Sequence, residues 1–380
     1  MYRSLILLTL LIWGSATVTA QERQDSTIRK GFLHDYWQSL INGNVDRTMQ
    51  KRFDVTFGIA PTYTHEGSFG IGGTMTGLYR MDRKNTSLPP SNIILSASAS
   101  LRGFYVLEAN GTNFFPDGRS RLIYNVRLSR KHLDFWGIRF EECAVNPTSR
   151  YVRTQVRVEG DYIYKLWNIF SVGAGIRINY ALAKDMTSPS YIDGQPDNCF
   201  LSGINGTAIL DTRDSHTNPS KGVHVVLSGT IWPSLLSDTR TTNYTAGLTA
   251  SAFIPVWKGG VMAADVYMKL HPEDCPWNLR EEICVSPGRM RGYYIGRYID
   301  SCQLTAQIEI RQNIYGRLGA VAWGGAGTLF PALDSFSWKN LLPNYGVGLR
   351  FEYKNDINLR ADVGFGRNTW GFSFGFSEAF

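Results

Sequence analysis

Gln303–Tyr315 reads QLTAQIEIRQNIY, and this stretch decides the fold of the chain. Apolar and polar residues alternate at every second position, which is the period of a β-strand. The apolar set is Leu304, Ala306, Ile308 and Ile310, and the polar set is Gln303, Thr305, Gln307, Glu309 and Arg311. The core between two sheets of a sandwich could not hold so many polar and charged side chains. In a transmembrane barrel the apolar face meets lipid and the polar face lines a wet interior, so the pattern favours a barrel.

The start of the chain and its composition agree with this interpretation. MYRSLILLTLLIWGSATVTA has one arginine before an apolar run and small residues after it, which predicts a secretory signal peptide over residues 1–20. No later stretch reaches the roughly 18 apolar residues of a transmembrane helix. The 38 glycines and 49 aromatic residues (10 Trp, 19 Tyr and 20 Phe) fit an outer-membrane barrel better than a soluble enzyme. A secreted sandwich or propeller is the alternative class.

Residues 53–380 read as sixteen amphipathic strands, the even number that a closed bacterial barrel needs. We therefore predict an all-β fold, an integral membrane antiparallel β-barrel in the bacterial outer membrane. The third, fourth and fifth strands are expected at 93–107, 119–130 and 132–140. Residues 21–52 are expected to form a short N-terminal periplasmic segment with one peripheral amphipathic helix.

The last expected strand, TWGFSFGFSEAF, carries a row of aromatic residues on one face. They are Trp370, Phe372, Phe374, Phe376 and Phe380. A soluble protein would aggregate through such an exposed edge strand. A terminal phenylalanine on an amphipathic strand resembles the recognition signal of outer-membrane barrels, which implies the barrel-assembly machinery as a partner during biogenesis.

With the start of the barrel in the periplasm, residues 272–301 form the sixth extracellular loop, between the eleventh and twelfth strands. This loop contains Met290-Arg291-Gly292-Tyr293, continued by Gly296-Arg297-Tyr298 and Asp300. The segment resembles the BamA/TamA superfamily of outer-membrane assembly barrels, also known as bacterial surface antigens. In that superfamily the sixth loop carries an arginine-glycine-aromatic motif and folds back into the lumen. The resemblance covers residues 53–380.

Two further segments carry the resemblance. DTRDSHTNPSKG is similar to the family's periplasmic turn between the eighth and ninth strands. The residues that match this turn are Asp211, Arg213, Asp214, Pro219 and Gly222. AQIEIR resembles the twelfth-strand motif whose glutamate meets the loop arginine, which here is Glu309. Strand alternation places this same glutamate inside the lumen.

The resemblance implies a lock that holds loop six in the barrel. The planar fork of Arg291 would pair with the carboxylate of Glu309, while Gly292 would allow a tight turn. Tyr293 would add apolar area with a polar tip. Gly325 stands where the family commonly has an aspartate, and Asp362 is the candidate replacement. The alternative is a mobile surface loop with solvated arginines.

The functional expectation follows from the same resemblance. Family members that handle polypeptides usually carry periplasmic POTRA domains, and residues 21–52 leave no room for one. We therefore expect outer-membrane assembly, or translocation of protein or lipid, with a separate periplasmic or lipoprotein partner and with outer-membrane lipids. The alternative is a passive solute pore whose lumen is constricted by the loop.

Other site classes receive little support. The chain has no recognisable catalytic or phosphate-binding motif, so we expect no enzyme activity and no cofactor. Cys275 and Cys284 share loop six and are candidate disulfide partners. Together with His271 they match no strong zinc spacing, so no metal site is predicted. The net charge of +7 is attributed to the lumen and the membrane interfaces, and export makes nucleic acid an unsuitable partner.

Overall fold

The computed structural model describes residues 48–380 apart from 65–67, 86–87, 285–287, 355–356 and 377. The chain divides into two compact units, Met1–Asn42 and Gly43–Phe380. The expected signal peptide and N-terminal helix lie outside the described residues. All the described strands belong to the second unit.

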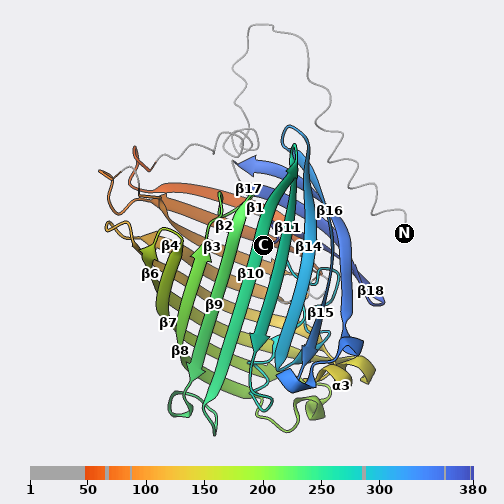
Figure 1. Ribbon diagram of the computed structural model, residues 1–380. Coiled ribbons are helices and arrows are strands. Elements are labelled where there is room, and N and C mark those ends of the chain that lie inside the picture. The colour runs from red at the N-terminus through yellow and green to blue at the C-terminus, as the bar shows by residue number, and fades with distance from the viewer. Residues whose placement is uncertain (1–47, 65–67, 86–87, 285–287, 355–356, 377) are drawn as a thin grey trace, which may run out of the picture. The chain divides into compact units, whose positions relative to one another are not determined.

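Sixteen strands form one antiparallel sheet in chain order, as the sequence predicts (Figure 1). The first eight are β1 (Asp54–Thr64), β2 (Ser68–Tyr79), β3 (Ser91–Ser100), β4 (Tyr105–Phe114), β5 (Ser120–Phe135), β6 (Ser149–Trp167), β7 (Phe170–Lys184) and β8 (Asn198–Asp211). The others are β9 (Gly222–Trp232), β10 (Asn243–Trp257), β11 (Gly260–Leu270), β14 (Cys302–Tyr315), β15 (Leu318–Phe330), β16 (Leu342–Lys354), β17 (Ile357–Gly366) and β18 (Thr369–Phe376). The sheet curls until β1 and β18 lie near each other, and among the described residues no ladder joins this seam.

Along the strands, exposed apolar side chains alternate with buried polar ones, as in a transmembrane barrel. On β14 the side chain of Ile308 is 54% exposed, whereas its neighbour Glu309 is 0% exposed. On β17 the buried Asp362 and the exposed Phe365 repeat the contrast. Polar residues therefore face the interior of the curled sheet and apolar residues face outward. Within the described part of the chain, no helix is long and apolar enough to cross a membrane.

The prediction of the third strand at 93–107 is wrong. The chain turns at residues 101–104, and β3 and β4 form a hairpin there. Gly103 takes a φ of 72° in this turn. The sequence hides the turn because apolar residues on both sides of it keep the same alternation, from Ala99 to Tyr105.

The predictions of the fourth and fifth strands, at 119–130 and 132–140, are wrong in the same region. β5 is one strand of 16 residues that runs through both. The ladder with β6 continues past the expected break, with Arg130 opposite Thr154 and Lys131 opposite Arg153. The two errors compensate, so the total of sixteen holds.

The connections differ in length at the two ends of the sheet. Two-residue turns join β6 to β7, β10 to β11 and β14 to β15, at what we call the turn end. The opposite, loop end carries the connection with helix α3 (Phe140–Val145), the connections with the 3-10 turns η1 (Pro189–Ile192), η2 (Ser234–Leu236), η3 (Leu333–Ser335) and η4 (Trp338–Asn340), and loop six. Loop six holds two short paired strands, β12 (Glu281–Glu282) and β13 (Ile299–Asp300).

This architecture predicts the behaviour of a detergent-stable barrel. The purified protein should give a β-rich circular dichroism spectrum in detergent and migrate faster on a gel when unboiled than when boiled. The cause is that a hydrogen-bonded sheet of sixteen strands resists detergent unfolding without heat. A helical spectrum, or a water-soluble monomer, would contradict this architecture.

Candidate functional site

Loop six is the connection between β11 and β14, residues 271–301 in the structure. Its described parts, 271–284 and 288–301, are folded into the barrel rather than spread over its rim. Its central arginine, Arg291, is 2% exposed although it lies far from either end of the loop. Met290 and Tyr293, on either side of the arginine-glycine pair, are also buried. The alternative of a mobile loop with solvated arginines therefore does not describe this structure.

The guanidinium of Arg291 is shared between two carboxylates on opposite sides of its fork. Its Nη2 donates to Oε2 of Glu309 on β14 at 2.7 Å, and its Nη1 donates to Oδ2 of Asp362 on β17 at 3.0 Å. The centre of the guanidinium also lies 3.5 Å from the ring centroid of Trp323 on β15, a cation–π contact. Loop six is thus joined to three strands through one side chain.

A ring of alternating charges surrounds this arginine. Glu309 Oε1 accepts from Arg311 Nε at 2.9 Å, and Asp362 Oδ1 accepts from Arg350 Nη1 at 2.6 Å. Glu378 closes the ring, with Oε2 at 2.9 Å from Arg350 Nε and 3.7 Å from Arg311 Nε. Three arginines and three carboxylates alternate, so every charge of the ring has an opposite neighbour. This pairing offsets the large cost of taking the charges out of water.

The backbone of the motif docks directly on the last strands. Gly292 has a φ of 104°, and a Cβ on it would lie 2.5 Å from the carbonyl carbon of Gly364 on β17, so only glycine fits here. Thr369 donates to the carbonyl oxygen of Gly292 at 3.0 Å, and Asn344 donates to that of Arg291. The glycine therefore sets how closely the loop approaches the wall.

Tyr293 anchors the C-terminal side of the motif through its hydroxyl. This hydroxyl donates to the carbonyl oxygen of Pro343 at 2.7 Å and accepts from the backbone nitrogen of Arg367 at 2.8 Å. The aromatic ring of Tyr293 packs in the buried apolar cluster at the loop end. The tyrosine combines apolar contact with a satisfied polar tip, as expected from the sequence.

Gly325 explains why the second carboxylate comes from another strand. A Cβ at Gly325 would lie 2.4 Å from the carbonyl oxygen of Ala306 and 2.7 Å from Cα of Gln307. The sheet is packed too tightly there for an aspartate. Asp362, the candidate that the sequence offered as a replacement, occupies the second position of the arginine fork.

Two glutamates that the sequence analysis missed clamp the other side of loop six. Glu281 Oε1 lies 2.9 Å from Lys269 Nζ and 3.3 Å from His271 Nε2, and Tyr267 donates to its Oε2 at 3.0 Å. Glu282 pairs with Arg153 on β6. Burial alone would raise the pKa of Glu281, but the positive Lys269 and the hydrogen bond from His271 outweigh it and hold this pKa below its usual value. The signal that could have found this contact is the pair of inward-facing cations, Lys269 and Arg153, together with two consecutive acids in the loop.

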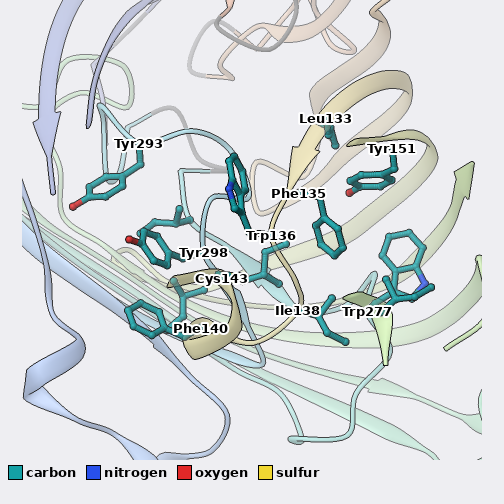
Figure 2. Packing of buried hydrophobic residues seen from close by; sticks show 14 of the residues in the cluster. Leu133, Phe135, Trp136, Ile138, Phe140, Cys143, Tyr151, Trp277, Tyr293 and Tyr298 are labelled. Carbon is teal, nitrogen blue, oxygen red and sulfur yellow. The ribbon is translucent and has the colours of Figure 1, made fainter. Parts of the chain in front are cut away.

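An apolar cluster closes the barrel interior at the loop end (Figure 2). Phe140 of α3 stacks on Tyr298 of loop six with ring centroids 5.0 Å apart. Arg297 lies over the rings of both Trp136 and Tyr298, at 4.7 Å from each centroid. In Figure 2, Tyr293, Tyr298 and Phe140 lie on one side of Trp136, and Phe135, Tyr151 and Trp277 lie on the other. The loop therefore packs against the β5–β6 connection as well as the β14–β18 wall.

The predicted turn motif lies between β8 and β9, where the sequence placed it. Arg213 donates from Nε and Nη2 to the two carboxylate oxygens of Asp211, at 3.0 and 2.8 Å. Asp214 accepts from the backbone nitrogens of Ser220 and Lys221, at 2.9 and 3.2 Å. Although burial raises the pKa of Asp214, the hydrogen bonds from Ser220 and Lys221 lower it to about 2. Pro219 is buried and Gly222 starts β9, so the five residues form one structured turn.

The prediction that Phe380 extends the outer aromatic row is wrong. Trp370, Phe372 and Phe374 do face outward, at 66%, 44% and 54% exposed, while the side chain of Phe376 lies outside the described part of the chain. After β18 the chain turns inward: the ring of Phe380 lies 6.2 Å from that of the buried Phe253, and its carbonyl oxygen accepts from Arg311 at 3.1 Å. Continued alternation would put Glu378 on the lipid face, and its charge is satisfied only inside.

The predicted disulfide between Cys275 and Cys284 is also wrong. Cys275 is a free thiol whose Sγ lies 3.8 Å from Ser301 Oγ. It packs with Cys199 and Leu201 in one cluster, whereas Cys284 packs against the cluster of Tyr298. The two cysteines sit on opposite sides of the folded loop, so a shared loop did not bring them together. Among the described residues, no group of histidines, cysteines and acids could hold a metal ion.

No protein-family model matches the sequence, and no curated protein matches it. Solved structures do match in fold, including the following three. BamA from Haemophilus ducreyi lacking POTRA domains 1-3 has a TM-score of 0.55 and 12% identity, over 86% of this chain and 70% of that one. CdiB from Acinetobacter baumannii has a TM-score of 0.53 and 12% identity, over 87% and 66%. CdiB from Escherichia coli has a TM-score of 0.55 and 10% identity, over 86% and 62%.

These likenesses show the fold. The chain has the barrel of BamA and CdiB, which is an outer-membrane β-barrel fold, as the sequence predicted. It spans 66% and 62% of the lengths of the two CdiB chains.

The charge ring makes a prediction for Arg291 and Glu309. Changing either residue to alanine should leave a buried charge without its partner and cost about 3–5 kcal/mol of folding free energy, less where water enters. The double change should cost less than the sum of the two single changes, because they share one contact. The midpoint of heat-modifiable migration or of urea unfolding in detergent measures both. Strictly additive costs would mean that the pair contributes nothing as a pair.

The buried thiols predict a labelling pattern. Burial raises the pKa of Cys143 to about 12 and that of Cys275 to about 11, and both side chains are 0% exposed. Since the thiolate is the reactive form, both should resist maleimide in the folded barrel and react after denaturation. In Arg291→Ala the loosened loop should speed labelling of Cys275, read for each cysteine by mass spectrometry. Rapid labelling of both thiols in the wild type would contradict the sealed loop end.

Proposed function

We propose that this barrel lies in the outer membrane and takes part there in membrane assembly or in translocation of protein or lipid, with separate periplasmic partners. The observation that carries the proposal is the fixing of loop six inside the lumen by Arg291, between Glu309 and Asp362. The likeness of the barrel to those of BamA and CdiB supports the same class of role. No enzyme activity is part of the proposal.

The orientation follows from the connections. Bacterial outer-membrane barrels place short turns in the periplasm and long loops outside. The two-residue turns β6–β7, β10–β11 and β14–β15 share one end of the sheet. The connections with α3 and η1 and loop six share the other end, together with the short turn between β17 and β18. We therefore assign the turn end to the periplasm and the loop end to the cell surface.

A passive pore is the second candidate, and the loop end argues against it. The interior there is filled by a cluster of buried apolar side chains that includes Trp136, Phe140, Tyr293 and Tyr298. An aqueous channel needs a polar path, and leaving apolar side chains around water costs free energy. A barrel sealed toward the outside is better suited to receive a cargo or partner from the turn end.

Single-channel recording in planar bilayers separates the two candidates. The wild-type barrel should show small, intermittent openings, and Arg291→Ala should raise the conductance because the loop loses its central anchor. Arg317→Ala, which removes an exposed arginine from a two-residue turn, is the matched control and should behave as the wild type. A large and steady conductance of the wild type, unchanged in Arg291→Ala, would favour the passive pore.

The partner is tested separately, by photo-crosslinking in envelopes. A photoreactive residue at position 216, on the exposed face of the β8–β9 turn, should crosslink to a periplasmic protein or lipoprotein. The same residue at position 235, in the exposed η2 of the loop end, should not capture it. Equal capture from both ends, or none from the turn end, would remove the periplasmic partner from the proposal.

A further inference from the structure

The outer face of β1–β5 carries an apolar groove of about 490 Å³. The strand register aligns Ile59, Gly73, Ala97, Leu107 and Leu128 in one row across the five strands. In this row the small Gly73 and Ala97 lie between the larger Ile59 and Leu107. In the neighbouring row the small Ala109 lies between Leu95 and Val126. The groove therefore forms where small side chains lie between larger ones. It is on the lipid-facing side of the sheet, because Ile59 is 66% and Leu107 is 53% exposed there.

A cluster of basic side chains stands at the loop-end rim of this groove. The hairpin of β3 and β4 ends at residues 101–104, whereas β5 continues beyond it. Arg130 and His132 follow Leu128 on the outward face of β5, and Arg102 lies in the hairpin turn; all three are exposed. Arg130 is two residues beyond the groove, about 7 Å along the strand.

In the part of the chain that the structure describes, these basic side chains have no acidic partner. Among the described residues, no carboxylate forms an ion pair with Arg102, Arg130 or His132. Asp134, the acid next along the same face of β5, already pairs with Arg150 at 3.3 Å. Lys131 turns to the inner face and lies over the ring of Phe104. The outward rim is thus positive, directly above an apolar surface.

We propose that this surface binds one lipid with a phosphorylated headgroup and several acyl chains. The acyl chains would lie in the groove, where a bilayer offers only hydrocarbon, and the phosphate would be held by Arg102 and Arg130. Guanidinium groups bind phosphate oxygens through charge-assisted hydrogen bonds, and His132 supplies a further donor. A free phosphate ion would use the rim alone, and the continuity of groove and rim favours the lipid. The proposal rests on the placement of the barrel in a membrane, but not on any assembly activity.

Lipid retention by the purified full-length protein in detergent tests the site. The probe is hexa-acylated, bis-phosphorylated lipid A, with phosphatidylcholine as the lipid control, and native mass spectrometry counts the lipid bound. We expect lipid A to be retained at least about tenfold more than phosphatidylcholine. The double variant Arg102→Gln/Arg130→Gln should lose most of this preference. Lys258→Gln/Arg317→Gln, two exposed cations of the turn end, should keep it.

A second variant tests the groove apart from the charges. A Cβ at Gly73 has its nearest contact at 3.8 Å, so Gly73→Leu fits the fold and fills the groove. It should lower lipid A retention about tenfold while heat-modifiable migration stays as in the wild type. Retention unchanged in both variants would overturn the proposal. So would full competition by inorganic phosphate, which would make the rim a simple anion site.

Failure here is distinguishable from failure of the proposed function. Lipid retention is measured on the isolated barrel and needs neither a partner nor a cargo. A barrel that captures a periplasmic partner but shows no lipid preference would lose only the lipid site.

Discussion

A buried arginine cannot stay charged without partners, and this requirement shapes the interior of the barrel. Arg291 is 2% exposed, so its guanidinium must be satisfied by the protein itself. One carboxylate would balance the charge of this guanidinium. A buried carboxylate has two oxygens, however, and each oxygen needs its own hydrogen-bond donor. The chain meets this need by alternating arginines and acids from loop six, β14, β16 and β17 and from Glu378. The last strands and the loop are therefore parts of one electrostatic unit.

The ring also explains where the chain goes after β18. Glu378 would stand on the lipid side if the alternation of β18 continued, and a charge there is unfavourable. Turned inward, it accepts from Arg350 at 2.9 Å and from Asn358 at 2.6 Å. Phe380 follows it and packs on Phe253 beneath the guanidinium of Arg311. One acidic residue thus redirects the end of a strand whose aromatic row faces lipid.

The sequence was sufficient for the features that depend on strand alternation. The inward position of Glu309 and Asp362 follows from counting residues on β14 and β17, and the pairing of Glu309 with Arg291 follows from the family resemblance. The missed features depend on contacts between distant segments. Glu281 and Glu282 meet Lys269 and Arg153 only once loop six is folded, and nothing local marks them as anchors. The separation of Cys275 from Cys284 has the same origin, since the folded loop places them in different clusters.

The anchors of loop six are unevenly distributed around the wall. Its ion pairs reach β6 through Glu282, β11 through Glu281 and Arg289, and β14 and β17 through Arg291. The inner faces of β2 and β3 present small side chains such as Thr74 and Ser96, whose hydroxyls lie 3.3 Å apart. A loop held from several directions by buried ion pairs is costly to release completely, because every freed charge must be solvated. Among the described residues, no ion pair joins loop six to β2 or β3, which lie next to the seam where β1 and β18 form no ladder. The charge ring therefore fixes loop six to one part of the wall, the part formed by β14, β16 and β17.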